Sequence, residues 1–382
     1  MLRFRRTLAA AVLAATAVLG MGASAAAAGQ RAVTGPPPGT AAWRADTVLG
    51  VRLPDPASAA PAEVAAFLAA LTPAQREALA VRHPLVVGNL DGAPFELRYR
   101  ANALALAQEH RAAAAAAADQ RLSSSARAAA RARAERYASL AGRQILAFDP
   151  RGRGQVAEVF GDLAQGRRTA VVVPGSDIDL MTFDRARDAG GTPAGMARAL
   201  RAATGDQVAV VAWAGYTTPV GLGLDAATAD LAVAGGERLA RFLTGLAERT
   251  GPATVFCHSY GSVVCARAGL GPEQAAGLVV LGSPGMETDR ATELRVPVWA
   301  AERGEADWIG EVPHLSVLGL GHGADPTGPG FGARLLSSAG SHGHTGYFAA
   351  GTASLANFAA LATGDLTAVR CATANRECQD AI

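Results

Sequence analysis

The sequence predicts an α/β protein in which a mostly parallel, doubly wound sheet follows an N-terminal helical region. From Gln144 onward, short apolar segments alternate with stretches of helical pattern such as GERLARFLTGLAER. Strands that are buried on both faces and separated by helices are typical of a parallel sheet with helices on both sides. Before Gln144, the stretch from Glu96 to about Leu140 is rich in alanine and arginine, which favour helix.

Composition sets the scale of the molecule and argues against one class of function. The 382 residues allow two or three domain-sized units, and 50% of them are hydrophobic although only 5% are aromatic. We therefore expect a large core built from small side chains. The net charge is +2, with three of the arginines in the first six residues, and no lysine occurs. A nucleic-acid binder needs a clustered basic patch, which this balance does not supply.

Residues 1–28 have the pattern of a secretory signal peptide. A basic stretch (MLRFRR) precedes an apolar run, and small residues follow with A-x-A sites around Ala23 to Ala28. The alternative is an uncleaved anchor, but the strongly apolar part, Leu8 to Gly22, is shorter than the ~20 residues that a span needs. We expect a secreted, extracellular protein with no stable transmembrane anchor, in which disulfides are permissible.

The next two segments lead up to the sheet. Residues 29–60 are rich in Pro, Gly and Ala and are interpreted as an extended linker or wrapping segment. Residues 61–143 are predicted to be helical. Thr72 to Gln75 form a capping box with proline at the first helical position, which predicts a helix to about Arg82. Ser123 to Ser125 are expected to break the long helical stretch into a pair.

The α/β domain is predicted over 144–366, with a C-terminal tail at 367–382. The expected strands are QILAFD, TAVVVPG, QVAVVAWAG, ATVFCHS, GLVVLGSPG and VPVWAAE. Cys371 and Cys378 lie seven positions apart in the polar tail, where a small-loop disulfide is predicted. Cys257 and Cys265 fit either a second bridge or two buried thiols, and the sequence leaves both open.

One strand is followed by a candidate nucleophile. Thr254 to Phe256 read as a strand, and Cys257-His258-Ser259-Tyr260-Gly261 then lead into a helical pattern. This arrangement of strand, sharp turn and helix resembles the nucleophile elbow G-x-S-x-G of α/β-hydrolases. Small residues are needed two positions before and after the serine so that strand and helix can approach. Gly261 meets this need, and Cys257 stands in place of the usual first glycine.

A nucleophilic serine needs a base and an orienting acid, which in this fold follow it in the order acid, then histidine. Asp307 follows the strand VPVWAA and is the predicted acid, with Glu302 and Glu305 as competitors. His344 lies in a loop just before the last apolar helix and is the predicted base, with His342 as its rival.

An oxyanion hole needs two N–H donors. One is expected from the backbone of Tyr260, directly after the nucleophile. The other is expected from the loop after the strand VVV, where Gly175 and Ser176 are the candidates. The segment GYTTPVGLG, which also follows a strand, is interpreted as a piece of the pocket wall.

The remaining histidines favour structural roles. His258 is expected to point away from the serine and to pack, and His322 is expected to bind backbone in a glycine-rich loop. His83, His110 and His314 show no metal-ligand spacing, so no metal site and no cofactor are predicted.

The quoted motifs together resemble a family of secreted actinobacterial alpha/beta hydrolases once catalogued as the domain of unknown function DUF1023. The matching segments are LTPAQREALAVRHPLVVGNLDGAPFELRYRAN, VVVPGSD, AWAGYTTP, CHSYGS, HGADPTGPGFGARLLSS and GHTGYFAAGTASLANFA, over about residues 70 to 360. The resemblance implies the α/β-hydrolase fold, with Ser259 as nucleophile and His344 as base. It supplies no substrate, and no role for the N-terminal helices.

These observations predict an exported serine hydrolase that cleaves a carboxylic ester or related acyl bond through Ser259, His344 and Asp307. Esterase or lipase activity is the default, while peptidase and acyltransferase activity fit the same residues. The expected partner is a small-molecule or lipid-like acyl substrate and not a nucleic acid; the oligomeric state is left open. The alternatives are a catalytically silent binding protein on this fold, and a cell-envelope interaction protein that works through its helical region.

Overall fold

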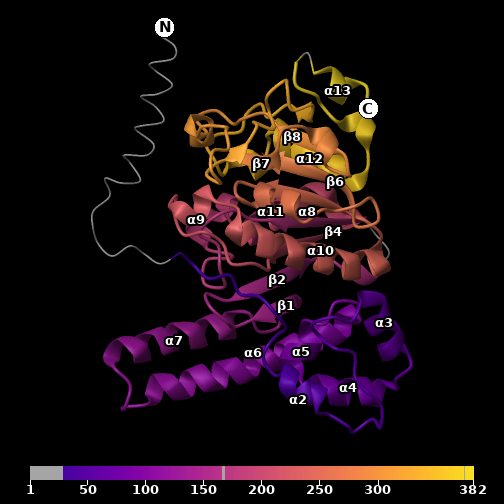
Figure 1. The fold of residues 1–382 in the computed structure, drawn as a ribbon, viewed down its shortest axis with the longest axis vertical. Helices are drawn as coiled ribbons and strands as arrows, with labels where there is room; N and C mark the ends of the chain where they lie inside the picture. The colour runs from indigo at the N-terminus through magenta and orange to yellow at the C-terminus, as the bar shows by residue number, and fades with distance from the viewer. Residues whose placement is uncertain (1–28, 166–167, 374) are drawn as a thin grey trace.

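The computed structural model describes residues 29–165, 168–373 and 375–382 (Figure 1). The predicted signal peptide, residues 1–28, lies outside the described residues. Within the described ranges, no helix combines the length and the apolar character that crossing a membrane would require.

An eight-stranded mixed sheet forms the centre of the molecule, in the order β1-β2-β4-β3-β5-β6-β8-β10. The pairs β1/β2 and β2/β4 are antiparallel, and all the other pairs are parallel, as the sequence predicted for most of the sheet. Its strands are β1 (Ile145–Asp149), β2 (Gln155–Phe160), β3 (Arg168–Val173), β4 (Val208–Ala214), β5 (Ala253–His258), β6 (Ala275–Leu281), β8 (Val298–Ala301) and β10 (Arg334–Leu336).

All six expected strands are confirmed, and the sequence missed β2 and β10. The apolar pattern that would predict β2 is interrupted by a charged residue. Glu158 lies within the strand, is 5% exposed and forms an ion pair with Arg143. The strand β10 has only three residues. The sequence also missed a small sheet formed by β7 (Gly285–Thr288) and β9 (His322–Gly323), whose pairing depends on contacts distant in sequence.

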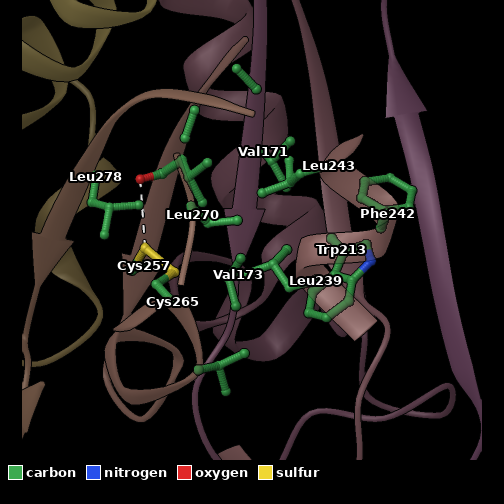
Figure 2. Packing of buried hydrophobic residues seen from close by; sticks show 14 of the residues in the cluster. Val171, Val173, Trp213, Leu239, Phe242, Leu243, Cys257, Cys265, Leu270 and Leu278 are labelled. Carbon is green, nitrogen blue, oxygen red and sulfur yellow. Dashed lines mark hydrogen bonds between the residues drawn. A yellow bond between two sulfur atoms is a disulfide. The ribbon is translucent and has the colours of Figure 1, made fainter. Parts of the chain in front are cut away.

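Helices cover both faces of the large sheet, so alternate residues of each strand pack against different helices. In β4, Val211 and Trp213 belong to one apolar cluster, and Val210 and Ala212 to the other. Figure 2 shows the first cluster, with Trp213 beside side chains of α10. One face carries α10 (Asp230–Thr250) and α11 (Gly261–Arg267), and the other α8 (Pro193–Thr204) and α12 (Ala353–Thr363). The short helix α13 (Arg376–Gln379) packs beside β10, with its Cys378 in the second cluster, and α9 (Leu224–Ala227) has no buried residue.

The N-terminal helices form a separate layer that docks on the β1 edge of the sheet (Figure 1). Arg98, 2% exposed, donates to Leu146 O at 3.0 Å, and Asn102 donates to Ile145 O at 2.9 Å. Arg98 also forms an ion pair with the fully buried Asp91 at 3.1 Å. The helices are α2 (Thr40–Arg44), α3 (Pro61–Ala69), α4 (Pro73–Arg82), α5 (Pro84–Gly88), α6 (Phe95–Ala118) and α7 (Ser124–Ser139), and the last two form the expected pair.

The segment 29–60 wraps around the protein. Gln30 Nε2 donates to Thr218 O at 3.0 Å, and Val33 N donates to Thr217 Oγ1 at 3.0 Å, so the segment contacts the loop after β4. Trp43 of α2 is fully buried and donates to Pro54 O at 2.7 Å. At the other end of the chain, the predicted disulfide between Cys371 and Cys378 is present.

The order of the strands reverses at one point, between β3 and β5. The chain leaves β3 toward β4 on one side, and leaves β5 toward β6 on the other, although β3 and β5 are neighbours. Such a reversal opens a crevice at the carboxyl ends of the two strands, where open α/β sheets bind their ligands. Gly175 follows β3 and Ser259 follows β5, so both lie at this crevice.

Candidate active site

Ser259 occupies a strained turn between β5 and α11. Its φ of 54° is in the left-handed region, which is unfavourable for a serine. The turn is held by its backbone, because Ser259 N donates to Leu281 O at 3.0 Å and Ser262 Oγ donates to Ser259 O at 2.7 Å. The residue is half-buried, so its side chain remains accessible at the strand end.

Two glycines explain how closely the chain approaches this turn. A Cβ on Gly261 would lie 2.6 Å from Val173 O, so α11 can begin beside β3 only with glycine there. A Cβ on Gly175 would lie 2.6 Å from Ser259 Cβ and 2.9 Å from its Oγ. The loop after β3 therefore lies directly against the candidate nucleophile.

The cysteine that replaces the first glycine of the elbow is bridged. Cys257, the last residue but one of β5, forms a disulfide with Cys265 of α11, eight positions later. Figure 2 shows this bridge inside the apolar cluster on one face of the sheet, and both cysteines are buried. The disulfide ties the strand and the helix together on either side of Ser259, which resolves the question that the sequence left open.

Asp307 and His344 form a hydrogen-bonded pair, with 2.8 Å between His344 Nδ1 and Asp307 Oδ1. The carboxylate also accepts from Ile309 N at 3.0 Å and from the Tyr347 hydroxyl at 2.6 Å. Burial alone would raise the pKa of Asp307, but the hydrogen bonds from His344, Tyr347 and the backbone outweigh it and hold the pKa below its usual value. The acid is therefore ionised at neutral pH.

The second ring nitrogen of His344 is not engaged by Asp307. Its Nε2 is buried and has no hydrogen-bond partner among the described residues, and its side chain is 11% exposed. The imidazole ring lies 4.5 Å from the ring of Trp308 and 4.8 Å from that of His258. A Cβ on Gly282, which directly follows the acceptor of Ser259 N, would lie 2.9 Å from His344 Cε1. The imidazole is thus packed against the loop that supports the serine.

His258 is buried and packs against His344. Nε2 of His258 lies 2.8 Å from His344 O. A neutral imidazole carries a proton on one ring nitrogen, so Nε2 donates to this carbonyl in the tautomer that is protonated there. Burial, and then the neighbouring His344, lower the pKa of His258 to about 3, so that it is neutral at neutral pH. The sequence indicated the packing but not this contact.

The rival residues lie outside this arrangement. His342 pairs with Glu305 at 3.0 Å, and both side chains are largely exposed. Glu302 lines a cavity of about 580 Å³ together with Arg303, Glu305 and residues 338–341. None of the residues that line this cavity is Ser259, Asp307 or His344, so its size does not make it the reaction site.

The candidate oxyanion donors lie on two supported segments. The loop after β3 is held by Tyr216, whose hydroxyl donates to Pro174 O at 2.7 Å, and by Asp177 N, which donates to Pro219 O at 2.8 Å. Tyr260 precedes the first turn of α11, where N–H groups have no intrahelical acceptor. Its hydroxyl donates to Thr228 O at 2.7 Å, which fixes the residue.

Sequence reasoning missed Tyr347 and Tyr216. Tyr347 lies three positions after His344, so its place in GHTGYF was the only signal available. His322 has the backbone contact that was expected, with 2.8 Å between Nε2 and Ala226 O, and it also pairs with Glu287. Across the described ranges, no group of three or more His, Cys, Asp or Glu side chains is arranged to hold a metal ion.

Comparison with known proteins gives a family match over residues 149–317, to a family described as "Alpha/beta hydrolase". The matched range includes Ser259 and Asp307 and ends before His344. Two uncharacterized proteins of Mycobacterium tuberculosis, from strains CDC 1551 and H37Rv, are 28% identical over 82% of this chain. The chain spans 57% of the length of each of these relatives.

Solved structures with partial similarity include two hydrolases. The apo form of esterase 2 from Thermogutta terrifontis is 12% identical, covering 39% of this chain and 66% of its own, with a TM-score of 0.25. A 2-hydroxy-6-oxo-6-phenylhexa-2,4-dienoate hydrolase from Rhodococcus is 17% identical, covering 37% and 48%, with a TM-score of 0.23. At these TM-scores the fold assignment rests on the strand order and the family match instead.

Proposed function

We propose that the protein is a serine hydrolase that cleaves carboxylic esters through an acyl-enzyme, which agrees with the match of residues 149–317 to an alpha/beta hydrolase family. The observation that carries the proposal is the Asp307–His344 pair, packed against the loop that holds Ser259. A buried, ionised Asp307 binds Nδ1 of His344, whose Nε2 is unpartnered among the described residues, beside a serine in a strained turn. This is the order of groups that activates a serine for acyl transfer.

In the first half of the proposed reaction, Ser259 Oγ attacks the ester carbonyl carbon while His344 Nε2 takes its proton. Asp307 accepts from His344 Nδ1–H and stabilises the imidazolium that forms. The N–H of Tyr260 and an N–H of the Gly175–Ser176 loop stabilise the oxyanion. The C–O bond of the ester then breaks, and the proton on His344 passes to the leaving alkoxide, which departs as an alcohol.

In the second half, His344 Nε2 takes a proton from water, and the hydroxide attacks the acyl carbon. The bond to Ser259 Oγ breaks, and the proton returns to that oxygen. The product is a carboxylic acid, and the enzyme is regenerated. Ester cleavage is proposed ahead of peptide cleavage because an alkoxide leaves more readily than an amide nitrogen. Secretion through residues 1–28 belongs to the same proposal, on the sequence pattern of that segment.

The test is labelling with a fluorophosphonate probe, which reacts only with an activated serine. Wild type is compared with Ser259→Ala and with Ser58→Ala, a control that removes the hydroxyl of an exposed serine in the wrapping segment. We expect labelling of wild type and control and none of Ser259→Ala, with equal thermal stability of all three. If folded wild type is not labelled, the protein is a binding protein on a hydrolase fold.

A further inference from the structure

Exposed apolar side chains are concentrated in two short loops. Sixteen large apolar side chains are exposed in the described part of the chain, and seven of them fall within residues 220–224 and 315–320. Residues 215–224 and 312–321 contain no Asp, Glu, Lys or Arg. We call the seven side chains the apolar rim: Val220, Leu222, Leu224, Leu315, Val317, Leu318 and Leu320.

The two loops are joined to each other, so the apolar rim is one surface. Gly321 N donates to Ala227 O at 2.9 Å, and the His322 ring contacts Ala226 O at 2.8 Å. In Figure 1 the helix α9, which begins at Leu224, lies on the same side of the molecule as the orange loops that follow β8. Contiguous exposed apolar patches of this kind mark interaction sites.

The apolar rim adjoins segments of the candidate active site on two sides. On one side, Gly221 N donates to Asp177 Oδ1 at 2.9 Å, which connects the loop after β4 to the candidate oxyanion loop. On the other side, the ring of Trp308 is 40% exposed and contacts His344, and the second rim loop begins a few residues later. The rim therefore lies beside the segments that carry the candidate active site.

The tip of the second loop places a leucine where local structure favours another residue. Val317 and Leu320 exchange backbone hydrogen bonds of 2.9 and 3.0 Å, and Leu318 and Gly319 between them have φ values of 53° and 80°. A two-residue turn with both φ values positive favours Asn-Gly, because asparagine tolerates this backbone and leucine does not. Leu318 is nevertheless 99% exposed, so no packing inside the protein accounts for its side chain.

We propose that the apolar rim inserts into a lipid–water interface, and that the substrates of Ser259 are esters held in such an interface. The inference rests on the proposed function and adds the physical state of the substrate to it. The rim is uncharged and ends in a protruding hairpin. Such a hairpin can enter the acyl chains of a lipid layer, whereas a protein partner with a flat surface would leave part of it uncovered. A leucine at a strained, fully exposed turn has no contact inside the protein that offsets the strain, as expected if its contact lies outside the protein.

The test is flotation of the protein with vesicles of phosphatidylcholine, a lipid without net charge. Leu318→Asn removes the apolar tip and suits the turn, so this variant should be at least as stable as wild type. We expect it to bind vesicles about tenfold more weakly, since burying one leucine side chain contributes that much to an equilibrium. Val48→Asn is the matched control, because Val48 is 66% exposed in a turn of the wrapping segment, and it should float like wild type.

Fluorophosphonate labelling of the same samples separates the two proposals. Protein that labels at Ser259 and does not float overturns the lipid proposal and leaves the hydrolase proposal intact. Protein that floats and does not label overturns the hydrolase proposal, and with it the statement about the substrates of Ser259, but leaves the insertion of the apolar rim into lipid intact. Two further results also contradict interface binding. One is a loss of vesicle binding in the Val48→Asn control equal to that in Leu318→Asn. The other is a wild-type dimer in light scattering that Leu318→Asn converts to monomer. Salt should leave flotation unchanged, because no ion pair with the lipid is involved.

Discussion

Gly175→Ala is the substitution that tests the candidate site without removing any of its reacting groups. The added Cβ would lie 2.6 Å from Ser259 Cβ, 2.9 Å from Ser259 Oγ and 3.2 Å from His258 O. Carbon atoms in ordinary contact are about 3.5–4.0 Å apart, so the serine and the loop must separate by about 1 Å. A displacement of that size at a reacting group costs about 10²-fold in rate.

We therefore expect Gly175→Ala to reduce the rate of fluorophosphonate labelling about 100-fold, while overpacking costs about 1–3 kcal/mol of stability. The control is Gly330→Ala, because a Cβ at Gly330 meets no atom within 4 Å. Labelling rate and thermal unfolding are measured on both variants and on wild type. If folded Gly175→Ala is labelled at the wild-type rate, the loop after β3 does not form part of the site.

Three other substitutions test a tyrosine that supports Asp307, the buried histidine beside His344, and an ion pair of the N-terminal helices. Tyr347→Phe removes a 2.6 Å hydrogen bond to Asp307, so ester hydrolysis should fall about tenfold and its acid limb should move to higher pH; an unchanged pH profile would contradict this role. In wild type, unfolded His258 binds a proton below pH 6.5, whereas the folded residue stays neutral down to about pH 3, so stability is lost as the pH falls between these values. His258→Gln should abolish this loss, which amounts to about 2 kcal/mol between pH 6.5 and 5, as urea unfolding at the two pH values would measure. Arg98→Ala leaves a buried aspartate without its closest partner and should cost about 3–5 kcal/mol, against less than about 1 kcal/mol for the exposed Arg100→Ala in the same urea assay.

The sheet and the elbow could be predicted because both depend on residues that are close in sequence. Strands such as β3 and β4 are continuous apolar runs, since each is buried on both faces. The turn at Ser259 is encoded by the strand before it, by Gly261 and by the helix after it. The order of acid and base then followed from the fold, and His344 and Asp307 do lie within hydrogen-bond distance. Their catalytic roles remain a proposal.

The rest could not be predicted because it depends on contacts between distant residues. Glu158 interrupts the apolar pattern of β2, and only its pairing with Arg143, distant in sequence, makes a strand with a buried carboxylate acceptable. Trp43 stands in a segment rich in proline and glycine, where nothing local indicates that it is fully buried. Tyr347 contacts Asp307 across 40 residues of sequence, and the periodicity of a single segment carries no information about such a pair.

The elbow itself shows how a departure from a motif is accommodated. Glycine two positions before the nucleophile leaves room for strand and helix to approach, whereas Cys257 brings a side chain into that space. The sulfur bonds to Cys265 of α11 and so becomes part of the contact between strand and helix. Closing a loop of this length stabilises the folded state by roughly 2–3 kcal/mol in the chain-entropy model. That is comparable to the ~1–3 kcal/mol that a residue in a left-handed backbone conformation costs, as Ser259 does. The bridge spans the strained residue, so the substitution that weakens the motif in the sequence supports the turn that the chemistry requires.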